Sequence, residues 1–265
     1  KKYLKCLPQD ALTRPSPCEA WDVGEVIAHL VWFAETYGGM AYRGLHGDIS
    51  APEGFPETPG TLSGPAVEEL YAKAAIARRR ELGEDLLPMF DQQYDWLNEV
   101  LGNIGPDDWQ KPCYHTNSIR PVEWFPGVII QELAIHEWDI RSNIEQSPLV
   151  SEDSLPCLME RASTRRRPWS FSFERGATLS GPIRYRFELT GPAGGRRDVV
   201  VEGDKPRIAT EAKGPANLYL FGDAGAFVLM MYDRLTLDSA IATGRFKAEG
   251  DLGLVPDFER WLARH

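Results

Sequence analysis

The chain has 265 residues, enough for one large domain or two ordinary ones, and its 43% hydrophobic and 26% charged residues are typical of a globular protein. It contains no run of about 18 apolar residues, so we expect no transmembrane helix. Its first residues also lack the apolar core of a signal peptide. The net charge is −10 and no broad basic face opposes it, which argues against a nucleic-acid-binding protein.

Four cysteines lie far apart in the sequence and form no Cys-x-x-Cys motif, which argues against a structural zinc knuckle or a thioredoxin-type redox site. Because no secretion signal is evident, we interpret them as reduced thiols of a cytoplasmic protein. None has an evident base partner, so nucleophilic cysteine catalysis is disfavoured. The four are Cys6, Cys18, Cys113 and Cys157.

The charge is unevenly distributed along the chain. Residues 1–145 contain 12 Lys and Arg against 23 Asp and Glu, a net charge of −11, whereas residues 146–265 contain 17 against 16, a net charge of +1. This shift indicates two domains with different surfaces. We place the boundary among residues 146–153 and assign residues 1–148 to the first domain and 149–265 to the second.

The first domain is predicted to be an antiparallel helix bundle. Asp22 is a suitable N-cap for a helix over residues 23–42, which has Glu25 at the capping-box position and apolar residues at the spacing of one buried face. A Pro- and Gly-rich loop, residues 44–65, follows and is long enough to be a lid. After a short N-terminal helical piece, the other helices are expected over residues 67–82, 85–104 and 122–144.

The second domain is predicted to be α+β. Residues 183–189 alternate between apolar and polar side chains, and with residues 198–202 across a glycine-containing turn they predict a β-hairpin. Further strands are expected near residues 207–211 and 245–249. Helices are expected over residues 216–221, 224–232 and 257–264.

Residues 131–141 are the stretch richest in candidate functional side chains. Glu132 and His136 are four residues apart, so one helix face presents both, and Asp139 follows about one turn later. His29 belongs to the first predicted helix. Two imidazoles and a carboxylate suit Zn²⁺ and leave a coordination position open. The spacing alone also allows core packing, because Glu-x-x-x-His is common in helices and a buried histidine is more often a packed core residue than a ligand.

Two stretches resemble the DinB-type four-helix metalloproteins: Pro-Ser-Pro-Cys-Glu-Ala-Trp-Asp-Val-Gly-Glu-Val-Ile-Ala-His-Leu at residues 15–30, and Glu-Leu-Ala-Ile-His-Glu-Trp-Asp-Ile at residues 132–140. Within that superfamily they most resemble the mycothiol-dependent maleylpyruvate isomerase family. Residues 244–252, Gly-Arg-Phe-Lys-Ala-Glu-Gly-Asp-Leu, resemble the closing block of the sterol-carrier-protein-like domain of that family. The resemblance implies an N-terminal all-α DinB-like four-helix bundle, residues 1–148, and a C-terminal α+β sterol-carrier-protein-like domain, residues 149–265.

Carried over to this sequence, the resemblance implies a divalent-metal site, usually zinc, formed by His29, Glu132 and His136. Asp139 matches the family's His-x-Trp-Asp pattern; it either orients a ligand histidine or forms an ordinary salt bridge. His115 lies in the loop before the fourth predicted helix; it could approach the site, but a surface position is favoured. The resemblance also implies that an arginine of the second domain approaches the thiol cofactor and an acidic substrate, and the candidates are Arg175, Arg184, Arg186 and Arg245.

The function implied by the resemblance is that of a metal-dependent enzyme using mycothiol or a similar low-molecular-weight thiol. The metal would hold this thiol as a thiolate, which would attack a small electrophilic, acidic substrate, for isomerisation or for S-transfer. Two alternatives remain open: a thiol-independent metal-dependent tailoring enzyme or hydrolase, and a hydrophobic-ligand-binding protein with a vestigial metal site. The expected partners are the substrate and the thiol, and we expect no binding to nucleic acid or to a membrane. The protein is expected to be a monomer or a homodimer.

Overall fold

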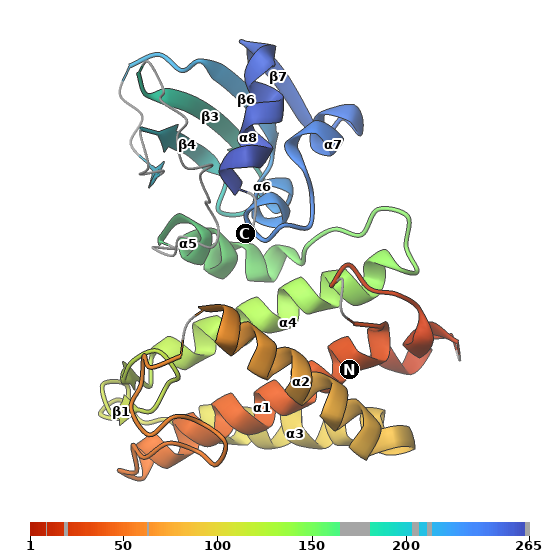
Figure 1. Ribbon diagram of the computed structural model, residues 1–265, viewed down its shortest axis with the longest axis vertical. Coiled ribbons are helices and arrows are strands. Elements are labelled where there is room, and N and C mark those ends of the chain that lie inside the picture. Colours follow the sequence, from red (N-terminus) through yellow and green to blue (C-terminus); the bar gives the residue numbers. More distant parts are fainter. Residues whose placement is uncertain are drawn as a thin grey trace. The chain divides into compact units, whose positions relative to one another are not determined.

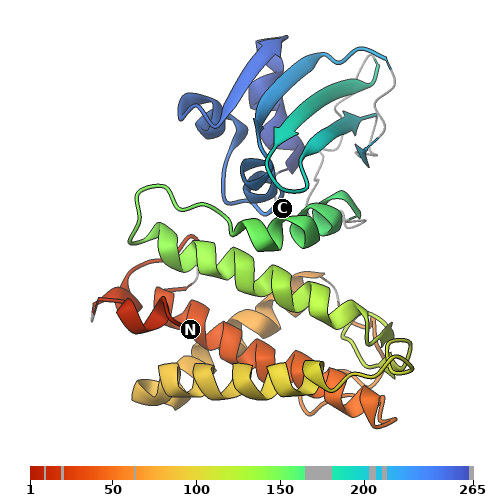
Figure 2. The same cartoon turned by 180° about the vertical axis from the view of Figure 1, so that it is seen from behind.

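The computed structural model describes residues 1–8, 10–18, 21–62, 64–164, 181–202, 207–210 and 214–262. Its contacts divide the chain into two compact units, Lys1–Pro148 and Leu149–His265 (Figure 1, Figure 2). Within the described ranges, the secondary structure of the first unit consists of helices and one pair of two-residue strands, and the second unit combines a five-stranded sheet with helices. The predicted fold class is therefore confirmed. No helix in the described ranges has both the length and the apolar character that crossing a membrane requires.

In the described part of the first unit, four α-helices form a bundle (Figure 1). The first of them contacts the other three, and it is consequently the most deeply buried element of the bundle. Two 3-10 turns, η1 (Leu4–Cys6) and η2 (Ala11–Thr13), precede it. The helices are α1 (Val23–Leu45), α2 (Gly64–Leu82), α3 (Leu86–Gly102) and α4 (Trp124–Ser142).

The start of α1 follows from its sequence. The Asp22 carboxylate accepts a hydrogen bond from the Glu25 backbone N–H at 2.7 Å, and the Glu25 carboxylate accepts one from the Asp22 N–H at 2.9 Å, which confirms the predicted capping box. The apolar residues that follow lie in the core of the bundle. Since α1 is enclosed by its neighbours, His29 is carried into the interior.

The connection between α1 and α2, described over residues 46–62, lies against the loop before α4. The Gly60 N–H donates to the Thr116 carbonyl at 2.7 Å, and the Tyr114 hydroxyl donates to the Pro56 carbonyl at 2.6 Å. These two hydrogen bonds attach the Pro- and Gly-rich connection to the loop before α4.

His115 lies in the same loop, which starts and ends at the short strands β1 (Pro112–Cys113) and β2 (Arg120–Pro121). Its ring is buried, and its Nε2 lies 3.5 Å from the Tyr37 hydroxyl. The expectation of a surface position is therefore wrong. The reason is that the loop folds back over α1 instead of extending into solvent.

The second unit is built on a five-stranded sheet with the order β5-β4-β3-β6-β7. All neighbouring strands are antiparallel except β3 and β6. One face is apolar, and its Phe187 ring contacts Phe227 of α6 and Phe258 of α8. The strands are β3 (Ile183–Thr190), β4 (Gly195–Val201), β5 (Arg207–Ala209), β6 (Leu218–Asp223) and β7 (Phe246–Gly250), and the helices are α5 (Leu155–Thr164), α6 (Ala224–Met231), α7 (Leu237–Ala242) and α8 (Val255–Leu262).

The helix predicted over residues 216–221 is wrong, because most of this segment belongs to strand β6. Leu218 and Leu220 are fully buried whereas Phe221 is exposed, which is the alternation of a strand. A short apolar run has too little periodicity to separate helix from strand. The segment is a strand because it pairs with β3 on one side and with β7 on the other. The helices α5 and α7 lie where no element was predicted.

Candidate metal centre

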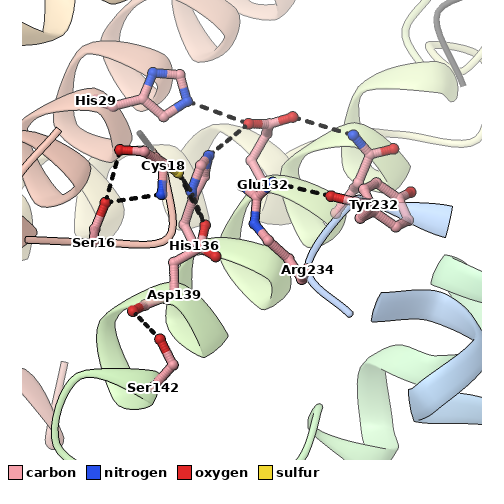
Figure 3. Close-up of polar contacts among 10 residues, drawn as sticks. Ser16, Cys18, His29, Glu132, His136, Asp139, Ser142, Tyr232 and Arg234 are labelled. Atoms are coloured by element: carbon pink, nitrogen blue, oxygen red, sulfur yellow. Dashed lines mark hydrogen bonds and ion pairs between the residues drawn. The ribbon is translucent and has the colours of Figure 1, made fainter. Parts of the chain in front are cut away.

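Two helices of the first unit bring His29, Glu132 and His136 together (Figure 3). His29 lies on α1, and the other two lie one turn apart on α4. Nε2 of His29 is 3.2 Å from Oε2 of Glu132, and Nε2 of His136 is 3.4 Å from the same oxygen. Three atoms of the kind that ligate metals therefore converge on one point in the bundle.

The three side chains differ in their exposure. His29 and His136 are buried, at 3% and 7% exposed, whereas the Glu132 side chain is 21% exposed. The second carboxylate oxygen of Glu132, Oε1, accepts a hydrogen bond from the Gln131 amide at 3.1 Å. The site is therefore enclosed on the histidine side and partly open on the carboxylate side.

Burial and neighbouring groups set the protonation of the three side chains. Burial lowers the pKa of His29 and favours its neutral form. Burial also acts to raise the pKa of Glu132, but its hydrogen bonds with His136 and His29 outweigh burial and lower that pKa. Burial likewise opposes the charged form of His136, yet contacts with Asp139, Cys18 and Glu132 raise the pKa of this ring well above its usual value.

The opposite edge of the His136 ring faces Asp139. Nδ1 of His136 is 2.9 Å from Oδ2 of Asp139, whose side chain is fully buried. In the neutral ring, a carboxylate that accepts the Nδ1–H hydrogen bond leaves the lone pair on Nε2, the nitrogen that faces Glu132 and His29. Of the two roles expected for Asp139, the contact favours orientation of the ring.

The loop before α1 brings Cys18 to the same carboxylate (Figure 3). The Cys18 Sγ lies 3.3 Å from Oδ2 of Asp139 and 4.0 Å from Nδ1 of His136. Ser16 holds this loop, since its hydroxyl accepts the Cys18 N–H at 3.1 Å and lies 3.3 Å from the Cys18 carbonyl. The expectation that no cysteine has a neighbouring base therefore fails for Cys18.

The donor set on the Nε2 side of His136 fits a divalent ion. Tetrahedral zinc with bonds of about 2.0–2.2 Å places neighbouring ligand atoms roughly 3.3–3.6 Å apart, and the two N···O separations here are 3.2 and 3.4 Å. His29 presents Nε2 to the Glu132 carboxylate at 3.2 Å, whereas its buried Nδ1 has no hydrogen-bond partner among the described residues.

The four residues singled out in the sequence, His29, Glu132, His136 and Asp139, thus lie together. That they bind a metal or take part in catalysis stays a prediction. Cys18 was missed as their neighbour. It lies in the quoted stretch of residues 15–30, but 121 positions separate it from Asp139, and no local spacing reports such a contact.

Three of the four candidate arginines of the second unit are engaged in ion pairs within that unit. Arg184 and Arg186 both pair with Asp198, at 2.5 and 3.0 Å, and Arg245 pairs with Asp223 at 2.8 Å. Arg175 lies outside the described residues.

Comparison with known proteins relates both units to established families. The family described as "Mycothiol maleylpyruvate isomerase N-terminal domain" matches residues 3–141, and the "SCP-2 sterol transfer family" matches residues 177–263. A search of curated proteins found no match.

Two solved structures are similar over most of the chain. The crystal structure of the mycothiol-dependent maleylpyruvate isomerase matches with a TM-score of 0.57 and 16% identity, over 88% of this chain and 83% of that one. A histidine-to-alanine mutant of this isomerase matches with a TM-score of 0.57 and 14% identity, over 94% and 86%. At such low identity, these matches show a shared fold.

The fold and the family matches define an isomerase-like enzyme in which a helix bundle is joined to a sterol-carrier-like α+β unit. The resemblance noted from the sequence is confirmed. The chain belongs to the mycothiol maleylpyruvate isomerase N-terminal domain family.

Proposed function

We propose that this protein is a divalent-metal-dependent isomerase or S-transferase that uses mycothiol or a similar low-molecular-weight thiol. In this proposal residues 1–148 form the metal-binding domain, residues 149–265 form the sterol-carrier-like domain, and zinc is the metal. The substrate class is a small electrophilic, acidic molecule. The thiol and the substrate class rest on the family, in which the similar solved enzyme is mycothiol-dependent.

One observation carries the metal part of the proposal: Nε2 of His29, Nε2 of His136 and Oε2 of Glu132 meet at metal-ligand separations inside the bundle. Three protein ligands leave one position of a tetrahedral ion open, which is the pattern of catalytic and not of structural zinc sites. An ion bound there acts as a Lewis acid, and it lowers the pKa of a thiol or water molecule that occupies the open position.

Each residue has a separate task in this proposal. Glu132 supplies negative charge and, being partly exposed, faces the side from which a small molecule enters. His29 and His136 supply ring nitrogens from a buried wall, and a metal at His136 would take the place of its Nε2 proton. Asp139 is a positioning residue, because it holds the Nδ1 edge of His136 and thereby directs Nε2 toward the site.

Metal analysis of the purified full-length protein tests the assignment. We expect about one zinc per chain, as a three-ligand site implies, and we expect His136→Ala to lose both zinc and thiol-dependent isomerisation of maleylpyruvate. His46→Ala is the matched control, because His46 is exposed and hydrogen-bonds only to the Tyr42 carbonyl in the described contacts. Full zinc retention by His136→Ala would contradict the proposal.

The same preparation separates the alternatives. Activity that survives complete removal of thiols would favour a thiol-independent metal enzyme. Copurified lipid without stoichiometric metal would favour a hydrophobic-ligand-binding protein.

A further inference from the structure

His136 presents each of its two nitrogens to a different set of ligand-type atoms. Nε2 faces Glu132 and His29, the set described above. Nδ1 faces Asp139 at 2.9 Å and Cys18 at 4.0 Å, and the Cys18 Sγ is itself 3.3 Å from Oδ2 of Asp139. A second triangle of nitrogen, oxygen and sulfur therefore shares one ring with the first.

The second triangle has the size and chemistry of a metal site. Bonds of about 2.0–2.3 Å to a tetrahedral ion place nitrogen, oxygen and sulfur ligands roughly 3.3–3.7 Å apart, and the three separations here lie between 2.9 and 4.0 Å. Cys18 is half-buried while Asp139 is fully buried, so Cys18 is the more exposed of these two residues.

We propose that Cys18, Asp139 and Nδ1 of His136 form a second metal site that selects thiophilic divalent cations such as Cd²⁺. This inference goes beyond the proposed function, which uses only the Nε2 side of the ring. The two sides differ in softness, because only the Nδ1 side contains sulfur. Soft ions favour thiolate ligands, whereas the His29–Glu132 side offers only nitrogen and oxygen.

The two sites are mutually exclusive, because a neutral imidazole has one lone-pair nitrogen and one N–H. When an ion binds Nδ1, the ring proton moves to Nε2, where the Glu132 carboxylate accepts its hydrogen bond. The thiol proton of Cys18 is released to solvent as its sulfur becomes a ligand. A thiophilic ion on the Nδ1 side therefore displaces zinc from the Nε2 side, one for one.

Titration of the full-length protein with Cd²⁺ tests the site through the ultraviolet sulfur-to-metal charge-transfer band, which reports a thiolate ligand. We expect the band in the native chain and its loss in Cys18→Ser, with Cd²⁺ affinity reduced by about 10–100-fold or more, since losing a ligand costs no less than losing an outer-shell partner. Cys6→Ser is the matched control, because Cys6 is an exposed cysteine of the same unit, and it should keep the band.

A second variant separates the two sides of the ring. His29→Ala removes a ligand from the Nε2 side only, so it should retain the charge-transfer band while it loses zinc. Thermal unfolding of each variant checks that the fold is kept. A band that persists in Cys18→Ser, Cd²⁺ binding without any band, or two ions bound per chain would each overturn the proposal.

This test is independent of the proposed function. If the native chain binds no zinc, the metal-dependent isomerase fails, yet the Cd²⁺ band and its dependence on Cys18 still report the second site. If zinc binds but Cd²⁺ gives no band, the isomerase stands and the second site fails.

Discussion

The His136 ring is held between two carboxylates of its own helix. Asp139 contacts Nδ1 at 2.9 Å and Glu132 faces Nε2 at 3.4 Å. Asp139 is fully buried, so water does not compete strongly for its oxygen. This buried contact therefore helps to orient the ring toward His29.

Asp139→Asn tests this contribution. We expect it to lower zinc affinity by about 10–100-fold, because an amide oxygen holds the Nδ1–H less strongly than a carboxylate does. Competition with a chelator of known affinity measures the change. Glu137→Gln on the same helix is the control, because the Glu137 side chain is 47% exposed and pairs only loosely with Arg141 at 3.6 Å. Equal affinities in the two variants would show that Asp139 does not position the ring.

At the scale of elements, α1 organises the bundle because its sides face three other helices. Its final turn lies against β1, where a methyl group on Gly44 would come within 2.7 Å of the Pro112 carbonyl oxygen. A methyl group on Gly39, five residues earlier, would meet nothing within 4 Å. Gly44 is therefore tightly packed, whereas Gly39 has free space beside its Cα.

Alanine at these two positions should change stability in opposite directions. We expect Gly44→Ala to destabilise the bundle by about 1–3 kcal/mol through overpacking. Gly39→Ala should stabilise it by about 0.5–1 kcal/mol, because alanine loses less backbone entropy in a helix. The free energy of unfolding in urea measures both changes. A neutral Gly44→Ala would mean that the loop around β1 shifts without cost.

The elements also show how far local pattern predicts structure. α1 was predicted because 20 residues of helical periodicity and a capping box agree with each other. The six residues 216–221 carry no comparable length of pattern, and their two neighbouring strands come from residues on either side of them in the chain. Strand pairing of that kind is a long-range interaction, which a short window does not contain.

At the scale of the whole molecule, each unit contains its own buried charged cluster. In the second unit, Asp198 is fully buried and accepts hydrogen bonds from Arg186 at both carboxylate oxygens and from Arg184 at one. Burial acts to raise the pKa of Asp198, but the two guanidinium groups outweigh burial and lower it. This cluster ties β3 to β4 on the face of the sheet opposite Phe187.

The acid stability of the second unit should depend on Asp198. Its pKa is lower in the folded than in the unfolded chain, so its contribution is fully present above about pH 3.9 and is lost as the pH falls through the folded value. We expect Asp198→Asn to cost about 3–5 kcal/mol near neutral pH, because the buried Arg186 and the partly buried Arg184 lose their partner. The variant should also lose less stability on acidification.

Urea unfolding followed by circular dichroism, repeated from neutral to acidic pH, measures both effects. Asp238→Asn, at an exposed position of α7, is the control. If Asp198→Asn loses as much stability on acidification as the native chain does, that loss must come from other carboxylates.

The sequence alone determined what is local. Two domains, the long helices and the pairing of Glu132 with His136 all follow from composition, periodicity or a four-residue spacing within one helix. The family resemblance proposed His29 as a partner of Glu132, 103 positions away, and the structure places the two together. Only the tertiary structure decided that Cys18 meets Asp139 across 121 positions and that β6 lies between β3 and β7. These contacts depend on how α1, α4 and the strands pack, and no short stretch of sequence encodes that packing by itself.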